Sequence, residues 1–284
     1  MKSRFRVAAV AYAAIGLGMT TPGVTAEALT QQDIDRCVNK GWAFSPDQAA
    51  SGCTVAIKSG KWSGQDLAWA YRDRGLAYSH AHDFDRAIAD LEQSIKLDPK
   101  PAIAHLSLGN AYAAKRDFAR AIASLDRAIE IDPKYATAYN DRGIIYDHKG
   151  DYDHAIADLV KATELNPLEP RFFNSLCWAR GAAGRDLPQA LQDCNRAVAL
   201  APADQNGYAM NSRGLIQFRL GAYDKAIEDF SAAIAQDPKD ADSLYARGIS
   251  RLRAGDRSGG AADVAAAKVV NPDVADPWTA VGVK

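Results

Sequence analysis

Cysteine thiols are the side chains of this sequence best able to do chemistry, and the sequence contains four of them. They form two similarly spaced sets, because Cys37 precedes Cys53 by 16 residues and Cys177 precedes Cys194 by 17. Structural zinc sites usually place two ligands within about four residues of each other, which neither set does. A nucleophilic thiol needs a partner base, and no histidine lies near either set in the sequence. The spacings therefore favour disulfide bonds.

Histidines and carboxylates form one further cluster, in the stretch "HAHD" that contains His80, His82 and Asp83. The stretch lies in a predicted turn, where polar residues are expected anyway. His148 and His154 flank the equivalent turn two repeats later, too far away to complete a metal site. The sequence also has no glycine-rich phosphate loop and no Gly-x-Ser-x-Gly motif. We therefore predict no metal, no cofactor and no enzymatic activity.

The elements that carry these residues recur along the chain with a fixed period. The segment "AYRDRGLAYSHAHDFDRAIADLEQSIKLDP" (70–99) is followed by "AHLSLGNAYAAKRDFARAIASLDRAIEIDP" (104–133). Prolines mark the period, with spacings of 34, 34, 35, 36 and 34 residues, at Pro99, Pro133, Pro167, Pro202, Pro238 and Pro272. Position 1 of the repeat is counted here from Ala68.

Each repeat has the pattern of two helices joined by a short turn. Glycine stands at position 8 of the first helix in five repeats, as Gly75, Gly109, Gly143, Gly214 and Gly248. The second helix carries a small residue at position 20, which is Ala87 in the first repeat. Small residues at a helix crossing allow close packing, and the closing proline ends the second helix because it cannot continue one. The last repeat has Gly260 at position 20, which predicts a weak second helix there.

This pattern of glycine, tyrosine, alanine, large apolar residue and proline resembles the tetratricopeptide repeat (TPR) family. The resemblance implies an all-α fold: a right-handed superhelical solenoid of stacked antiparallel helix pairs, with about six repeats after a divergent N-terminal helix pair. The expected boundaries are 27–67 for the N-terminal pair, 68–101, 102–135, 136–169, 170–206, 207–240 and 241–274 for the repeats, and 275–284 for a C-terminal capping helix.

The repeat numbering aligns the cysteines with one another. Cys37 and Cys177 both fall at position 8, and Cys53 and Cys194 both fall at position 24. No other repeat has a cysteine at either position, so the two occur together or not at all. We predict two disulfides within helix pairs, Cys37–Cys53 and Cys177–Cys194. Each closes a loop of about 16 residues, which the chain-entropy model values at about 3 kcal/mol.

Arginine and aspartate are matched in a similar way. Position 7 is arginine and position 23 is aspartate in four repeats, as Arg74 with Asp90, Arg142 with Asp158, Arg213 with Asp229, and Arg247 with Asp263. We predict an ion pair between the two helices of each of these repeats. The alternative is that these residues are unpaired, solvated surface charges.

The first helices are expected to line the concave side of the solenoid, which in TPR proteins commonly holds an extended peptide or a partner helix. Position 5 is asparagine in three successive repeats, as Asn140, Asn174 and Asn211. An amide offers both a donor and an acceptor to a peptide backbone. The apolar residues predicted beside this asparagine ladder are Trp178, Leu215, Tyr245 and Ile249. The alternative is that the asparagines are merely tolerated and the apolar residues pack between repeats.

Residues 1–26 have the pattern of a secretory signal peptide. "MKSRFR" is basic, "VAAVAYAAIGLGM" is apolar, and Val24 and Ala26 are small residues before the expected cleavage point. The apolar run is shorter than the roughly 20 residues of a membrane-spanning helix. We therefore expect an exported protein, periplasmic or secreted, that is not inserted in the membrane after cleavage.

The formal net charge is −1 with both signs interspersed, which argues against nucleic acid as a partner. The sequence favours a non-enzymatic scaffold that binds a protein or an extended peptide. The alternative is a structural subunit of an envelope assembly that self-associates through its solenoid.

Overall fold

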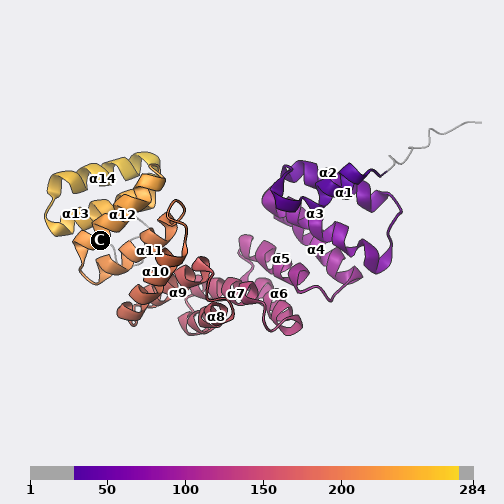
Figure 1. Ribbon diagram of the computed structural model, residues 1–284, viewed down its shortest axis with the longest axis horizontal. Helices are drawn as coiled ribbons and strands as arrows, with labels where there is room; N and C mark the ends of the chain where they lie inside the picture. The colour runs from indigo at the N-terminus through magenta and orange to yellow at the C-terminus, as the bar shows by residue number, and fades with distance from the viewer. Residues whose placement is uncertain (1–28, 275–284) are drawn as a thin grey trace, which may run out of the picture.

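The computed structural model describes residues 29–274, which form fourteen α-helices and two short 3-10 helices without any strand in that range (Figure 1). The helices are α1 (Gln31–Val38), α2 (Pro46–Lys58), α3 (Ala68–His80), α4 (Phe84–Leu97), α5 (Ala102–Ala114), α6 (Phe118–Ile131), α7 (Ala136–His148), α8 (Tyr152–Leu165), α9 (Pro170–Ala183), α10 (Leu187–Leu200), α11 (Gly207–Arg219), α12 (Tyr223–Gln236), α13 (Ala241–Ala254) and α14 (Arg257–Val270). The 3-10 helices are η1 (Lys40–Trp42) and η2 (Gly64–Leu67). The expected signal peptide and C-terminal capping helix lie outside the described residues.

Antiparallel helix pairs stack along the chain, which confirms the predicted all-helical solenoid. The helices from α3 to α14 form six pairs, and α1 with α2 forms another pair before them. Figure 1 shows the stack as an arch, with the first and last pairs at its two ends and α7 and α8 near its middle. Consecutive pairs also touch through their first helices, since α7 contacts α9 and α9 contacts α11.

The second helices begin at aspartate caps. The side chains of Asp83, Asp117 and Asp151 accept a hydrogen bond from the backbone N–H three residues later. Such a cap satisfies one of the amides that the first turn of a helix leaves unpaired. The cap therefore fixes where the turn ends and the second helix starts.

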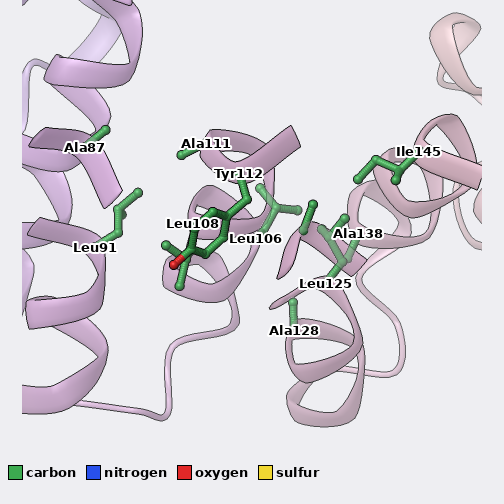
Figure 2. Close-up of a cluster of buried hydrophobic side chains, with 11 residues drawn as sticks. Ala87, Leu91, Leu106, Leu108, Ala111, Tyr112, Leu125, Ala128, Ala138 and Ile145 are labelled. Carbon is green, nitrogen blue, oxygen red and sulfur yellow. The ribbon is translucent and has the colours of Figure 1, made fainter. Parts of the chain in front are cut away.

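Apolar clusters bridge successive helix pairs. One cluster joins Leu91 of α4, Tyr112 of α5, Leu125 of α6 and Ile145 of α7, and Figure 2 shows these side chains spread along the row of helices from Leu91 to Ile145. Leu91 and Leu125 are fully buried. Because each pair covers the apolar face of the next, a single repeat could not bury its core alone.

Position 8 and position 24 are in direct contact within a pair. A Cβ atom built on Gly75, Gly109 or Gly143 would lie 2.8 Å from the Cγ atom of the leucine at position 24. Real Cβ atoms do not approach other carbon atoms so closely, so any larger residue at position 8 would have to displace that leucine. Glycine is therefore needed wherever position 24 keeps a large side chain.

Cysteines replace both contacting residues together in two helix pairs. The structure joins Cys37 of α1 to Cys53 of α2, and Cys177 of α9 to Cys194 of α10, with Cα–Cα distances of 4.4 and 5.3 Å. All four cysteines are at most 1% exposed. A covalent bond here takes the place that a leucine, phenylalanine or valine side chain fills in the other repeats.

The last repeat departs from the sequence prediction. Helix α14 has 14 residues, as many as the other second helices, although Gly260 was expected to weaken it. A Cβ atom at Gly260 would lie 2.8 Å from the carbonyl oxygen of Gly248 and 2.7 Å from Cγ of Leu252. Glycine thus lets α13 and α14 pack closely, and this packing offsets the low helix propensity of glycine.

The predicted ion pairs within repeats are confirmed. Each arginine at position 7 donates from Nε and Nη2 to the two carboxylate oxygens of the aspartate at position 23, at 2.6–2.8 Å. In the fourth repeat Asp193 has no arginine at position 7 and instead accepts from Arg180. Arg180 stands at position 11, which is tyrosine in the first three repeats, as Tyr78, Tyr112 and Tyr146.

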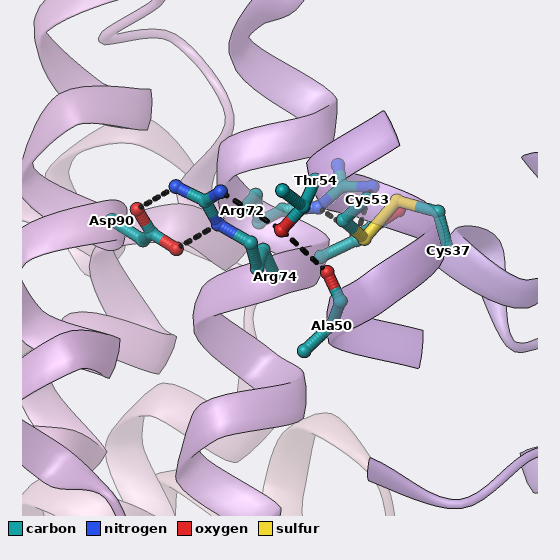
Figure 3. The surroundings of a disulfide bond; sticks show 8 residues. Cys37, Ala50, Cys53, Thr54, Arg72, Arg74 and Asp90 are labelled. Atoms are coloured by element: carbon teal, nitrogen blue, oxygen red, sulfur yellow. Dashed lines mark hydrogen bonds and ion pairs between the residues drawn. A yellow bond between two sulfur atoms is a disulfide. The ribbon is translucent and has the colours of Figure 1, made fainter. Parts of the chain in front are cut away.

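The same arginines also reach the preceding helix pair, which the sequence did not predict. Their Nη1 atoms donate to the residue at position 25 of that pair, at 2.5–3.3 Å, namely Thr54, Asp126, Asn195 and Ser231. Figure 3 shows this arrangement for Arg74, which bonds Asp90 on one side and Thr54, one residue after Cys53, on the other. Each arginine therefore ties two successive pairs together.

A double-mutant cycle measures these ties. The side chains of Arg142 and Asp158 are 18% and 11% exposed, so their two charged hydrogen bonds are expected to couple by about 1–3 kcal/mol. Asp126 is 46% exposed, so its coupling to Arg142 should stay within about 1 kcal/mol. Chemical denaturation of the single and double alanine variants gives both values, and a stronger coupling to Asp126 would contradict the assignment.

Disulfide pairing is tested by non-reducing peptide mapping of the mature protein. We expect Cys37 linked to Cys53 and Cys177 linked to Cys194, with no free thiol. Because Gly143 and Leu159 occupy the same two positions, the double variant Gly143→Cys, Leu159→Cys should form a third disulfide on oxidation. The pair Leu159→Cys, Lys161→Cys keeps Gly143 and is the control; it should keep two free thiols, since Lys161 is exposed on α8. A Cys37–Cys194 link would refute the pairing.

Candidate functional site

Two adjacent hollows lie along the first helices α5, α7 and α9. The first, of ≈ 320 Å³, is lined by Asn110, Ala113, Phe118, Asp141, Ile144, Ile145 and His148. The second, of ≈ 210 Å³, is lined by Ile144, Asp147, His148, Leu159, Asn174, Ser175 and Trp178. Ile144 and His148 border both hollows, so the two form one groove that crosses three helix pairs. These twelve different residues are what the term groove refers to in the following text.

Two of the sequence-predicted residues, Asn174 and Trp178, line the groove. Asn140 lies next to the lining residue Asp141 and is 7% exposed. Its Nδ2 donates to Asp141 Oδ1 at 3.1 Å, while its Oδ1 and that of Asn174 are buried without a hydrogen-bond partner. The two amides with unpartnered oxygens therefore belong to the third and fourth repeats.

The remaining predicted residues are corrected by the structure. Leu215, Tyr245 and Ile249 are 3–8% exposed and belong to the apolar core formed by α11 to α14. They pack between repeats, as the alternative interpretation of the sequence held. Asn211 donates from Nδ2 to Oγ of the fully buried Ser243 at 2.6 Å, so its amide is used within the solenoid.

Carboxylates at the groove were missed by sequence reasoning. Asp141 accepts from Nδ2 of Asn110 at 2.9 Å as well as from Asn140, and burial raises the pKa of its carboxyl. Burial also raises the pKa of Asp147, whose Oδ1 has no hydrogen-bond partner. Asp147 stands three residues after Ile144 and at position 12 of its repeat, and that spacing on one helix face was the available signal.

Other candidate chemistry finds no support in the geometry. His80 packs against Trp42, with ring centroids 4.2 Å apart. Within residues 29–274, no group of three histidine, cysteine, aspartate or glutamate side chains is arranged to hold a metal ion. No helix in that same range is long and apolar enough to cross a bilayer.

A solenoid of stacked helix pairs with an open groove on its first helices defines a class of protein that binds other chains along an extended surface. Family models for the tetratricopeptide repeat match residues 72–136, 108–172 and 179–249, together more than half of the sequence. The chain belongs to the tetratricopeptide repeat family. No curated protein matches the sequence.

Three solved structures illustrate proteins with a similar fold. YrrB, described as a TPR protein with an unusual peptide-binding site, is 27% identical over 64% of this chain and 93% of its own, with a TM-score of 0.50. Pseudomonas aeruginosa pilF is 20% identical over 76% and 99%, with a TM-score of 0.64. PilW, a type IV pilus biogenesis factor, is 18% identical over 76% and 98%, with a TM-score of 0.66. The last two share the fold alone.

The buried charge of Asp147 predicts a pH-dependent stability change. Its raised pKa means that the folded state is penalised for ionising this carboxyl as the pH rises above 3.8, and that the penalty is absent below that value. Asp147→Asn removes the penalty, so the melting temperature at pH 7 should rise by roughly 1–3 °C. The gain should vanish near pH 3.8.

Asp153→Asn is the matched control for this measurement. Asp153 lies on α8, is 80% exposed and faces Arg185 at 2.8 Å. Its loss removes the same charge from an exposed position and should leave the melting temperature unchanged within about 1 °C. A drop in melting temperature for Asp147→Asn at pH 7 would show that the carboxylate stabilises the free protein.

Proposed function

We propose that this protein is an exported, non-enzymatic scaffold that binds an extended segment of a partner protein in the groove across α5, α7 and α9. The observation that carries the proposal is the pair of buried amide oxygens, on Asn140 and Asn174, without hydrogen-bond partners. Buried polar groups are nearly always paired in folded proteins, and an unpaired one costs about 1–3 kcal/mol. Backbone N–H groups of a bound segment would supply the missing donors.

The dimensions of the groove suit an extended chain. Packed helices lie about 8–10 Å apart, so the span from α5 to α9 is roughly 20 Å. An extended chain advances about 3.3 Å per residue, which gives about six residues across this span. Ile144 and Trp178 offer apolar contact along the way, and the membership of the family supports a role in protein interaction.

Export is the second part of the proposal. The signal-like pattern of residues 1–26 supports it, and so does the placement of all four cysteines in two bonded pairs. Disulfides persist in oxidising compartments and are rare in the reducing cytosol. Cell fractionation with antibody detection tests it, because a full-length protein found only in the cytosol would refute export.

Peptide selection tests the binding role directly. A phage-displayed library of random peptides, selected on the mature protein, should yield peptides that bind the wild type. Asn174→Ala should weaken their binding about fivefold or more, because one hydrogen bond to a desolvated partner is worth about 1 kcal/mol. The melting temperature of this variant should not fall, because Oδ1 of Asn174 has no hydrogen bond to lose in the free protein.

Asn211→Ala is the matched variant outside the groove. It deletes the bond to Ser243 and should lower the stability by about 1 kcal/mol while peptide affinity is preserved. Lys161→Ala and Glu228→Ala change exposed positions of the second helices α8 and α12 and should alter neither quantity. If the selected peptides bind Asn174→Ala normally but no longer bind Lys161→Ala, the binding surface lies on the second helices instead.

A further inference from the structure

The hollow between α7 and α9 is lined by two buried acceptor oxygens to which no donor of the described residues is bonded. Asp147 and Asn174 line it from facing helices, and Oδ1 of each is buried without a partner. Other carboxylates on the first helices are satisfied, since Asp141 accepts from two amides and Asp73 pairs with Arg72 at 2.8 Å. Two of the five buried, unpartnered side-chain atoms of the described residues therefore belong to the lining of this hollow.

The position of Asp147 in the last turn of α7 disfavours an ionised carboxylate. Asp147 is the second-last residue of α7, and the last turn of a helix carries a partial negative charge that disfavours a carboxylate. The position thus costs stability twice, through the helix dipole and through burial. A bound positive charge would remove both costs.

We propose that this hollow takes a lysine or arginine side chain of the bound segment, with the carboxylate of Asp147 as its ionic partner and Oδ1 of Asn174 as a second acceptor. The inference rests on the binding role proposed above and names the chemistry of the occupant. An ammonium or guanidinium group is a donor without an acceptor, which matches two acceptors without donors. An acidic side chain or a C-terminal carboxylate would instead meet the charge of Asp147.

The walls of the hollow fit the rest of such a side chain. Ile144, Leu159 and Trp178 offer apolar surface to the methylene stem, and the indole face attracts a cation placed over it. The volume of ≈ 210 Å³ is below the roughly 300–1,000 Å³ of pockets that enclose whole small molecules. It is the scale of one long side chain, with the backbone of the segment left in the groove.

Neighbouring cations are already engaged. Arg171, near the start of α9, bonds Glu169 at 2.9 Å, and Arg185, after α9, bonds Asp153. His148 borders the hollow, is exposed, stacks on Phe118 with ring centroids 6.3 Å apart, and its charge when protonated favours the ionised Asp147. Oδ1 of Asp147 accepts no hydrogen bond from it or from any other described residue, and is left for a ligand.

The selected peptide library supplies the first test. Peptides whose binding depends on Asn174 should share a lysine or arginine at one fixed position, and replacing it with glutamine should weaken binding about tenfold, as expected for a charged hydrogen bond in a partly buried site. Groove-dependent peptides without such a position would overturn this inference and leave the scaffold role standing. A selection that yields no groove-dependent peptide would overturn both.

Charge exchange supplies the second test. Asp147→Asn should lower the affinity for the basic peptide about tenfold, and Asp153→Asn, with the same loss of net charge outside the groove, should change it less than about twofold. Asp147→Lys should bind the lysine-to-glutamate peptide better than the original one. If Asp147→Lys keeps its preference for the basic peptide while folded by circular dichroism, Asp147 is not the ionic partner and the inference is wrong.

Discussion

The contact between positions 8 and 24 is the constraint on which the rest of this solenoid depends. It brings the two helices of a pair so close that a Cβ atom at Gly75 or Gly143 would lie 2.8 Å from a leucine side chain. Only two solutions occur at this contact among the complete helix pairs of residues 29–274: a glycine facing a larger residue, or two bonded cysteines. The distance between the helices then determines which neighbouring residues can meet, and the bidentate Arg–Asp pairs lie one residue away from it.

Those arginines convert paired helices into a stack. Each one bonds its own aspartate with two nitrogens and the preceding pair with the third, so one side chain fixes both the hairpin and its neighbour. The apolar cluster that passes from α4 to α7 supplies the burial energy, while the planar guanidinium sets the register because its donors point in fixed directions. The first helices are thereby held side by side, and the groove is the surface that they leave uncovered.

Among the described residues, buried polar side-chain atoms without hydrogen-bond partners occur on the first helices of the pairs. Five side-chain atoms in the described range are buried without a partner, and four of them belong to first helices of successive repeats: Asn140, Asp147, Asn174 and Gln217. The second helices contribute none of the five. The spare hydrogen-bonding capacity of the described residues thus lies on the first helices, three of which border the proposed groove.

The sequence by itself determined the helix pairs, their order and their internal contacts, because these depend on residues within one period of 34. The cysteine pairs and Arg–Asp pairs could be predicted for that reason. The exposure of the side chain at position 9 could not be predicted from the sequence. Ile144 and Trp178 line the groove, whereas Leu215 and Ile249 at the same position are buried. Whether this position is open depends on the side chains of the adjoining repeats, such as Leu244 and Tyr245 of the next repeat, which share a core cluster with Leu215, and on how successive pairs stack. Only the tertiary structure brings those residues together, so only it decided where the groove lies and that Asp147 faces Asn174 across it.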